Sequence, residues 1–296
     1  MDAPRAVSGS RRAFLKGSAS VMLMSGLGSS LLSACGGGVG SDAKPTARLS
    51  SVDNFRDIGG AAAGYPTVDG KQVVRGAFYR SNVLTLSQAD EATLNALGIA
   101  MIYDLRTPAE VSHTQDVMPV GAAYTNINVT GSADAPMSCY LNGDMQGNVI
   151  AAMEEQERHY VTDPKQRANF GALLTQLANT PGTQLIHSQA GKDRAGWVAA
   201  VLLSIANVPF EVIMQDYLLT NVYSSQSIKA HVAEIEAQRG EAAAQATAPI
   251  FGVQDSILQA GFDQVQASFG TMQSYLTDGL GLSQSTIDTL RARLVG

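Results

Sequence analysis

Residues 183–208 contain the feature that most constrains the fold: a short apolar strand, a tight loop with three charged residues, and a long apolar helix. We expect the strand at residues 183–187 and the helix at residues 196–208, which carry no charged side chain. A helix that is apolar on all sides must be buried on all sides. A buried strand joined to a buried helix is typical of an α/β domain with a largely parallel sheet.

The same alternation of strand and helix signals continues over residues 50–294. Residues 64–81 predict a β-hairpin, because an Asp-Gly pair separates two extended runs. A helix is expected from its cap at Ser87 to its end at Gly98, and a buried strand follows at residues 99–103.

Polar residues come directly after that strand. Thr107 and Glu110 form a capping box with proline at the first helical position, so a new helix begins here. Asp104 and Arg106 therefore fall at the carboxyl end of a strand, which is the edge where open α/β sheets bind ligands.

Residues 131–163 are a long segment with weak signals, a loop followed by a helix with an acidic face. Such a segment is either a lid over a site or a surface insertion. Beyond residue 208 the pattern is helical, and the Ala/Gln-rich residues 240–249 are expected to be a loop or a frayed helix end. We predict one α/β domain, residues 50–296, with a central, mostly parallel sheet flanked by helices and with extra C-terminal helices.

Residues 1–34 have the features of an export signal: a basic start, an apolar middle and small residues before a cysteine. Residues 11–16 (RRAFLK) resemble a twin-arginine signal, and residues 32–35 (LSAC) resemble a bacterial lipobox, whose cysteine is acylated after cleavage. The resemblance implies a folded protein exported to the periplasmic face of the cell envelope or the cell surface. Lipid on Cys35 would anchor it to the membrane through a flexible tether, residues 35–49. An uncleaved amphipathic N-terminus is the alternative.

Charge and cysteine content narrow the function further. The chain has a net charge of −6, and residues 1–34 hold four basic residues and one acidic residue, so the mature chain has a net charge of −9. This charge does not suit nucleic acid. Cys35 and Cys139 are the two cysteines, so lipid on Cys35 leaves no internal disulfide, and we expect Cys139 to be a buried or loop thiol.

The loop between the strand and the apolar helix has the composition of an anion site. Consecutive backbone N–H groups at this position can point inward, and the helix dipole adds positive potential. Gly191 allows a tight turn, Arg194 offers a planar, two-pronged grip on phosphate, and Lys192 adds charge at the rim. The predicted phosphate-binding residues are Gln189, Ala190, Gly191, Lys192 and Arg194.

Two other kinds of loop fit less well. A nucleotide P-loop requires glycine, and then Ser or Thr, where this chain has Ile186 and Asp193. The nucleophile elbow of serine hydrolases requires a small residue in place of Ile186, although Ala190 fits that motif.

Residues 187–194 (HSQAGKDR) resemble the His-Cys-x5-Arg loop of cysteine-dependent protein tyrosine phosphatases, with Ser188 in place of the cysteine. The AGKDR core is similar to the bacterial tyrosine and phosphoinositide phosphatases, which are distantly similar to dual-specificity enzymes. The resemblance extends over nearly the whole mature chain and implies the fold of that group. The other matching segments are NFRDIGG (54–60), YRSNVL (79–84), YDLRTPAE (103–110), MQDYLLTN (214–221) and YLTDGLGLSQSTIDTLRARL (275–294).

The resemblance implies that a thiolate attacks phosphorus, that the arginine and loop amides stabilise the transferring phosphoryl group, and that an aspartate protonates the leaving oxygen. A serine hydroxyl stays protonated in such a loop and needs a general base, whereas His187 is expected to hold the loop. We therefore expect Ser188 to preserve phosphate binding and to weaken turnover; a barrier higher by roughly 6 kcal/mol slows a reaction about 10⁴-fold. Ala195, where many members carry Ser or Thr, is a second departure.

Several aspartates are candidates for the general acid. Asp193 in the loop and Asp104 at the neighbouring strand end are the main ones, and an ion pair with Arg106 is the alternative role of Asp104. Asp144 and Asp163, in the segment 131–163, are weaker candidates.

The remaining polar residues are expected to support the site. Arg56 and Asp57 would brace it rather than react. His113, His159 and His231 have no metal-ligand spacing, so we predict neither a metal nor a cofactor.

Three functions follow from these observations. The first is a phosphatase of the tyrosine phosphatase family, acting weakly on phosphotyrosine or another phosphomonoester. The second is a pseudophosphatase that binds a phosphorylated protein, phosphoinositide-like lipid or sugar at the cell envelope. The third is a serine hydrolase that uses Ser188. The oligomeric state is left open.

Overall fold

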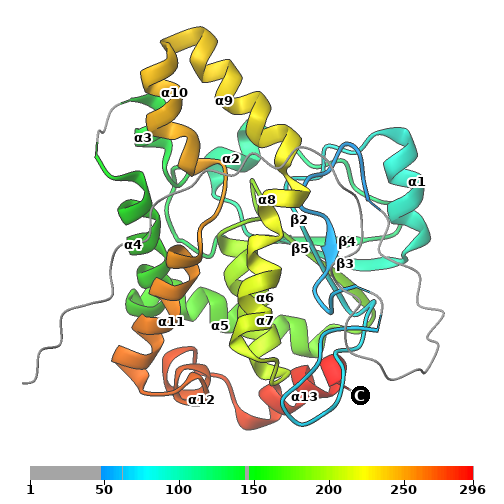
Figure 1. Ribbon diagram of the computed structural model, residues 1–296. Coiled ribbons are helices and arrows are strands. Elements are labelled where there is room, and N and C mark those ends of the chain that lie inside the picture. The colour runs from blue at the N-terminus through cyan, green and yellow to red at the C-terminus, as the bar shows by residue number, and fades with distance from the viewer. Residues whose placement is uncertain (1–47, 62, 144–146, 296) are drawn as a thin grey trace, which may run out of the picture. The chain divides into compact units, whose positions relative to one another are not determined.

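The computed structural model describes residues 48–61, 63–143 and 147–295. The strands of this part of the chain form one sheet in the order β1-β2-β5-β3-β4, with β5 at its centre (Figure 1). β1 pairs antiparallel with β2, and the other neighbours are parallel, which confirms the prediction of a mostly parallel sheet. The strands are β1 (Arg56–Asp57), β2 (Phe78–Ser81), β3 (Ile99–Asp104), β4 (Ala123–Asn126) and β5 (Thr183–His187).

Helices flank this sheet and continue to the C-terminus, as predicted. Among the described residues, no helix is both long enough and apolar enough to cross a bilayer. The helices are α1 (Gln88–Ala96), α2 (Pro108–His113), α3 (Ser138–Asn142), α4 (Val149–Thr162), α5 (Pro164–Asn179), α6 (Arg194–Ile205), α7 (Phe210–Leu218), α8 (Thr220–Tyr223), α9 (Ser225–Arg239), α10 (Glu241–Thr247), η1 (Ala248–Ile250), α11 (Asp255–Phe269), α12 (Met272–Ser274), the π-helical turn η2 (Tyr275–Gly279) and α13 (Gln284–Val295).

The sheet separates two apolar cores. Successive residues of a strand face opposite sides, so Phe78 and Ile186 enter the larger core, whereas Tyr79 and Leu185 enter the smaller one. Figure 1 shows α1 on one side of the sheet and α4, α5, α6, α7 and α11 on the other. Both faces are covered, which explains why β5 reads as a continuous apolar run.

Helix α6 is buried along nearly its whole length, as its composition predicts. The ring of Trp197 lies 6.3 Å from that of Tyr160 on α4, 5.6 Å from that of Phe262 on α11, and 6.0 Å from that of Tyr275 on η2. The C-terminal helices therefore complete the same core as the sheet.

The predicted hairpin at residues 64–81 forms only next to its turn, where Thr67 N donates to Lys71 O and Val73 N donates to Tyr65 O, each at 2.9 Å. Its Asp-Gly turn exists, with Gly70 at φ +77°, but the two arms share a single isolated bridge between Pro66 and Gln72. β2 pairs with β1 and β5 instead. Every residue of β2 is buried, and a fully buried strand requires a partner on each side for its backbone hydrogen bonds.

Two segments with weak sequence signals are helical. Residues 240–249, expected as a loop or frayed end, are mostly covered by α10 and η1. In the segment 131–163, helix α4 packs against α11 and buries Met153 and Tyr160, so its second half belongs to the core.

The topology brings the carboxyl ends of three strands together. His187, the last residue of β5, pairs with Ser81 at the end of β2 and with Asp104 at the end of β3. The loop that follows β5 therefore starts at the centre of this edge, which is the usual ligand edge of an open α/β sheet.

Candidate active site

The loop from Ser188 to Asp193 joins β5 to the first residue of α6, Arg194. Gly191 has φ +66°, a region that L side chains rarely adopt. A Cβ atom at this position would also lie 2.3 Å from the carbonyl oxygen of Ser81, at the end of β2. The tight turn thus requires glycine for its conformation and for its packing.

The carbonyl groups of the loop are held by side chains from outside it. Arg80 Nη2 donates to the carbonyl oxygens of Gly191 at 2.6 Å and Lys192 at 3.0 Å. Asn54 Nδ2 also donates to Gly191 O, at 2.7 Å. Among the described residues, no group accepts from the amides of residues 189–193. Carbonyls fixed outward leave these N–H groups available to an anion.

A buried ion-pair network supports Arg80. Asp216 on α7 lies 3.5 Å from Arg80 and 3.1 Å from Arg56, and it accepts a hydrogen bond from Tyr65 at 3.0 Å. Burial alone would raise the pKa of Asp216, but the charges of Arg56 and Arg80 and the Tyr65 hydrogen bond lower it below its usual range. Arg56 therefore acts on the loop through Asp216 and Arg80.

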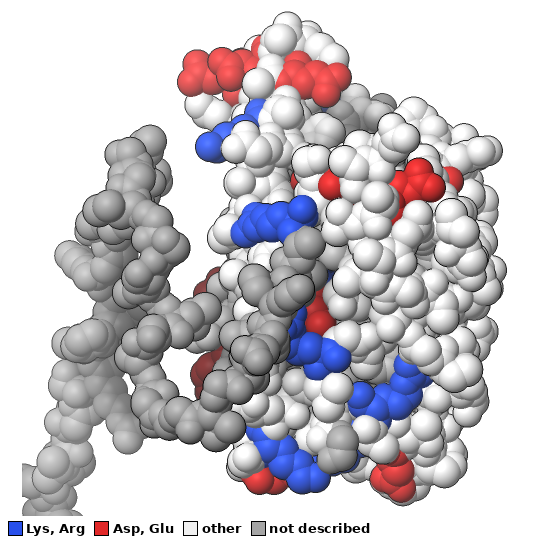
Figure 2. All heavy atoms as spheres, turned by 90° about the vertical axis from the view of Figure 1, so that its right-hand side faces the viewer, with Lys and Arg blue, Asp and Glu red and all other residues white. Residues whose placement is uncertain are grey.

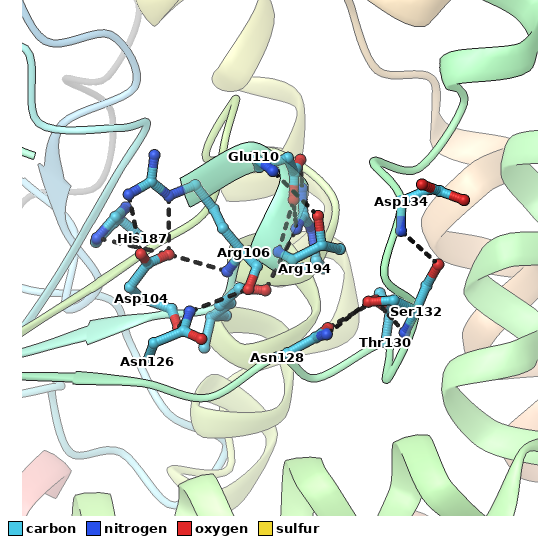
Figure 3. Close-up of polar contacts among 12 residues, drawn as sticks. Asp104, Arg106, Glu110, Asn126, Asn128, Thr130, Ser132, Asp134, His187 and Arg194 are labelled. Carbon is cyan, nitrogen blue, oxygen red and sulfur yellow. Dashed lines mark hydrogen bonds and ion pairs between the residues drawn. The ribbon is translucent and has the colours of Figure 1, made fainter. Parts of the chain in front are cut away.

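Arg194 is oriented by Glu110, a residue that the sequence identifies only as part of a capping box. Its Nη1 and Nη2 each donate to the Glu110 carboxylate at 2.7 Å (Figure 3). Burial would raise the pKa of Glu110, but the hydrogen bonds and charge of Arg194 and the Thr107 amide lower it. This carboxylate takes up one edge of the guanidinium, so the edge formed by Nε and Nη2 is the one left for a ligand.

A pocket of about 290 Å³ opens above the loop. Its base includes Ser188 and Arg194, and its walls come from two separate parts of the chain. The wall residues are Pro136, Met137 and Leu141 from the segment 131–163, Ser227, Ile228 and His231 from α9, and Ile250 and Phe251 beyond α10. The first half of the segment 131–163 thus lines the pocket, and its role as a lid stays a prediction.

The helix α9 was not expected to contribute to the site. His231 stacks on Phe251 with ring centroids 5.0 Å apart, and both line the pocket. Figure 2 shows acidic side chains gathered over the outer end of the α9–α10 hairpin, where Glu234, Glu236 and Glu241 are exposed.

Ser188 lies at the base of the pocket with only 2 % of its surface exposed. Among the described residues, none accepts a hydrogen bond from its hydroxyl group, so no general base is hydrogen-bonded to it. His187 faces the other way: its Nε2 lies 3.5 Å from Asp116 and 3.9 Å from Asp104. Burial lowers the pKa of His187 although these carboxylates favour its charged form.

Of the two main acid candidates, the structure brings only Asp193 to the pocket. Asp104 is fully buried, accepts from Arg106 Nε at 2.9 Å and from Tyr124 at 2.7 Å, and does not line the pocket. Its position fits the alternative role, an ion pair with Arg106, and its role as a general acid stays a prediction.

The two weaker candidates for the general acid are Asp163 and Asp144. Asp163 caps α5 by accepting from the amides of Lys165 and Gln166, and it does not line the pocket. Asp144 lies outside the described residues. Asp53, which the sequence did not single out, does line the pocket.

Lys192 is more buried than the rim position predicted from the sequence. Only 6 % of its surface is exposed, and its Nζ donates to Asp193 and to the carbonyl oxygen of Gly252, each at 3.2 Å. Its charge still borders the pocket, but the side chain joins the loop to the segment after η1.

Asp57 braces the sheet edge and not the loop. Its carboxylate accepts from the amides of Gly59 at 2.9 Å and Gly76 at 2.7 Å. Burial raises its pKa to about 6.

Three of the described residues form a cluster of potential metal ligands. Asp104, Asp116 and His187 each offer a ligand atom, and these atoms lie within 4.8 Å of one another. The guanidinium of Arg106 already lies among them, with Nη2 at 2.9 Å from Asp104 and 2.5 Å from Asp116. A cation would have to displace this positive charge.

The cysteine predictions concern different parts of the chain. Cys139 is a half-buried free thiol on α3 and does not line the pocket. Cys35, the export signal and residues 35–47 of the tether lie outside the described residues.

A loop between a central parallel strand and a buried helix, followed by an arginine held by Glu110, defines an α/β protein with its candidate site at the carboxyl edge of the sheet. Residues 47–296 match the model of the tyrosine phosphatase family, and the chain belongs to that family.

Relatives with known names support the same assignment. The chain is 28 % identical over 284 residues to the triple specificity protein phosphatase PtpB of Mycobacterium tuberculosis, covering 84 % of this chain and 98 % of that protein. It is 29 % identical over 234 residues to a Cupriavidus necator protein named as a candidate tyrosine-protein phosphatase, covering 78 % and 83 %. Among solved structures, a kinase associated phosphatase with serine in place of its catalytic cysteine matches at 17 % identity and a TM-score of 0.30, covering 70 % of this chain and 88 % of that one.

Proposed function

We propose that this chain binds the phosphoryl group of phosphotyrosine, or of another phosphomonoester, in the loop at residues 188–194 and turns it over slowly. One observation carries the proposal: loop amides without protein acceptors and the free edge of Arg194 surround a pocket whose base holds Ser188. Amides and a guanidinium edge are the donors that phosphate oxygens require.

The walls of the pocket favour an apolar ester group. Met137, Leu141, Ile228 and Phe251 line it above the loop. An aryl group bound to the phosphate would bury its ring against these side chains. The Mycobacterium tuberculosis relative is named a triple specificity phosphatase, so more than one class of phosphoester is a reasonable probe.

Hydrolysis through Ser188 lacks one proton acceptor. Its oxygen would form a bond to phosphorus and lose its proton, while the leaving oxygen would take a proton from Asp193. Asp193 lines the pocket, but no described group accepts a hydrogen bond from the serine hydroxyl. The same lack argues against a serine hydrolase.

A pseudophosphatase, which binds a phosphorylated partner without turnover, is the second candidate. Ser188 favours it, since the thiolate that the family resemblance implies is missing while the binding groups remain. We place either activity at the cell envelope, on the strength of the export and lipidation motifs at residues 11–16 and 32–35.

The test compares the full chain with its Ser188→Cys variant on a chromogenic aryl phosphate. We expect the cysteine to raise turnover on the order of 10⁴-fold, because the loop that binds phosphate also stabilises a thiolate. Arg194→Ala in the same background should abolish that gain. Calorimetry with a phosphotyrosine peptide should detect binding to the natural chain and not to Arg194→Ala. No binding and no gain with cysteine would refute the proposal.

A further inference from the structure

Glu157 is a buried acid with no role in the site described so far. It lies on α4, in the same segment whose first half lines the pocket. The residue is 0 % exposed, and among the described residues neither carboxyl oxygen has a hydrogen-bond partner. A carboxylate anion in such a place loses its hydration and gains no hydrogen bond in return. Burial therefore raises the pKa of Glu157 well above its usual range.

The groups that act on Glu157 belong largely to the anion loop and its support. Asp193 opposes ionisation of Glu157, whereas Lys192 and Arg80 favour it. Arg80 is the side chain that holds the loop carbonyls. Glu157 lies one helical turn before Tyr160, whose ring is 6.3 Å from that of Trp197 near the start of α6, so Glu157 is within electrostatic reach of the loop.

Other polar atoms in this region also lack partners. Tyr217 OH and Arg80 Nε are buried without hydrogen bonds among the described residues. Both side chains meet at the first turn of α6, since a Cβ on Gly196 would lie 3.0 Å from Arg80 Nη2 and 3.1 Å from Tyr217 Cε2. The titratable and charged groups that interact with Glu157 are Lys192, Asp193, Arg80, Tyr217, Tyr160 and Tyr275.

We propose that Glu157 is a positioning residue of the anion loop, whose neutral carboxyl group allows the loop to hold a dianion and whose ionisation opposes that binding. The inference rests on the proposed function, because it assumes that the loop binds a phosphate-like anion. An ionised Glu157 would place a buried negative charge within electrostatic reach of the loop, where charges are poorly screened. By linkage, a bound dianion must in turn hold the proton on Glu157 more tightly.

The test uses sulfate, which stays a dianion from about pH 6 to about pH 10 and adds no proton step of its own. The full chain is compared with Glu157→Gln, which keeps the shape and the neutral state, and with Glu155→Gln as the control. Glu155 lies on the same helix, but its side chain is 55 % exposed.

Infrared spectroscopy follows the carboxyl band that is lost in Glu157→Gln. We expect this band to show a protonated acid at neutral pH, with an ionisation midpoint that rises when sulfate is bound. Calorimetry should find that sulfate affinity falls at high pH, by up to about tenfold per pH unit, in the natural chain and in Glu155→Gln. In Glu157→Gln this fall should be absent or smaller.

The outcomes separate the two proposals. A chain that binds no sulfate overturns the proposed function, and this inference with it. A chain that binds sulfate but has the same infrared midpoint with and without it, or the same pH dependence in Glu157→Gln, overturns only the role of Glu157. If the band shows a protonated acid up to about pH 10 both with and without sulfate, the role of Glu157 is likewise overturned.

Discussion

At the scale of single residues, Gly191 combines two requirements that no other residue type meets. Its backbone is left-handed, and the end of β2 occupies the space where a side chain would begin. The sequence predicts the tight turn, but only the neighbouring strand makes the position intolerant of a methyl group.

Gly191→Ala should therefore damage the loop more than its backbone angle alone predicts. An L residue at positive φ costs about 1–2 kcal/mol, and the clash with Ser81 O at 2.3 Å must also move the loop. We expect at least a tenfold loss of sulfate or phosphate affinity in calorimetry. Gly270→Ala is the control, because Gly270 has φ +75° but no atom near its missing Cβ. Equal binding by both variants would contradict this prediction.

Asp57 predicts a pH dependence of stability. Its pKa is about 6 in the folded chain and near 3.8 when unfolded. Below the lower value both states are protonated, so full stability is present there. As the pH rises from about 4 to about 6 the unfolded state loses its proton first, and stability falls by about 3 kcal/mol in total.

Asp57→Asn removes this titration while leaving other acids, including Glu157, unchanged. In denaturant titrations, the natural chain should lose stability relative to the variant between about pH 4 and about pH 6, with a constant difference above that range. A difference that is the same at every pH would show that Asp57 ionises normally.

At the scale of elements, the loop after β5 is held from β2 and α7. Arg80, at the third position of β2, donates to two loop carbonyls and pairs with Asp216 on α7. A strand, a loop and a helix far apart in sequence thus share one guanidinium. The position of the loop is set by this contact as much as by its own glycine.

Arg80→Met should loosen the loop and destabilise the domain. It leaves two carbonyls and part of a buried carboxylate without a partner, and breaking a buried pair from one side costs about 3–5 kcal/mol. We expect a matching loss in urea unfolding and a weaker affinity for sulfate. Arg291→Ala, which removes an exposed pair with Asp69 and one hydrogen bond to the carbonyl oxygen of Ile205, should change stability by less than about 2 kcal/mol and binding not at all. Similar effects of the two substitutions would argue against a role for Arg80.

At the scale of the described domain, the C-terminal helices and the sheet share one core. Trp197, the only tryptophan, contacts aromatic rings from α4, α11 and η2. Its fluorescence therefore reports on packing among elements that are distant in sequence.

Thermal unfolding of the full chain should consequently give the same midpoint by tryptophan fluorescence and by far-ultraviolet circular dichroism. A shared core unfolds cooperatively, since loss of one helix exposes the faces of the others. Trp197→Leu, followed by circular dichroism alone because it removes the fluorescent side chain, should lower the midpoint, since about 3 kcal/mol or more is lost when a large buried aromatic side chain is truncated. A helical signal that survives the fluorescence change would show that the C-terminal helices form a separate unit.

The amino-acid sequence alone determines a substantial part of this protein. The apolar helix after residue 195, the capping box at Thr107 and the Gly-containing loop are local patterns, and they predict the mostly parallel sheet and an anion loop at its edge. Local patterns are sufficient here because hydrophobic periodicity and turn chemistry depend on neighbours within a few positions.

Only the tertiary structure decided which residues support that loop. Asn54, Arg80 and Glu110 contact the loop or its arginine from positions far along the chain. Helix α9 lines the pocket. Asp104 forms an ion pair with Arg106 and does not line the pocket. A side chain's partner depends on strand order and helix packing, which no local period encodes. The loop could therefore be predicted from the sequence, whereas the side chains that hold it, the pocket walls and the buried Glu157 on α4 are brought together only by the packing of the sheet and its helices.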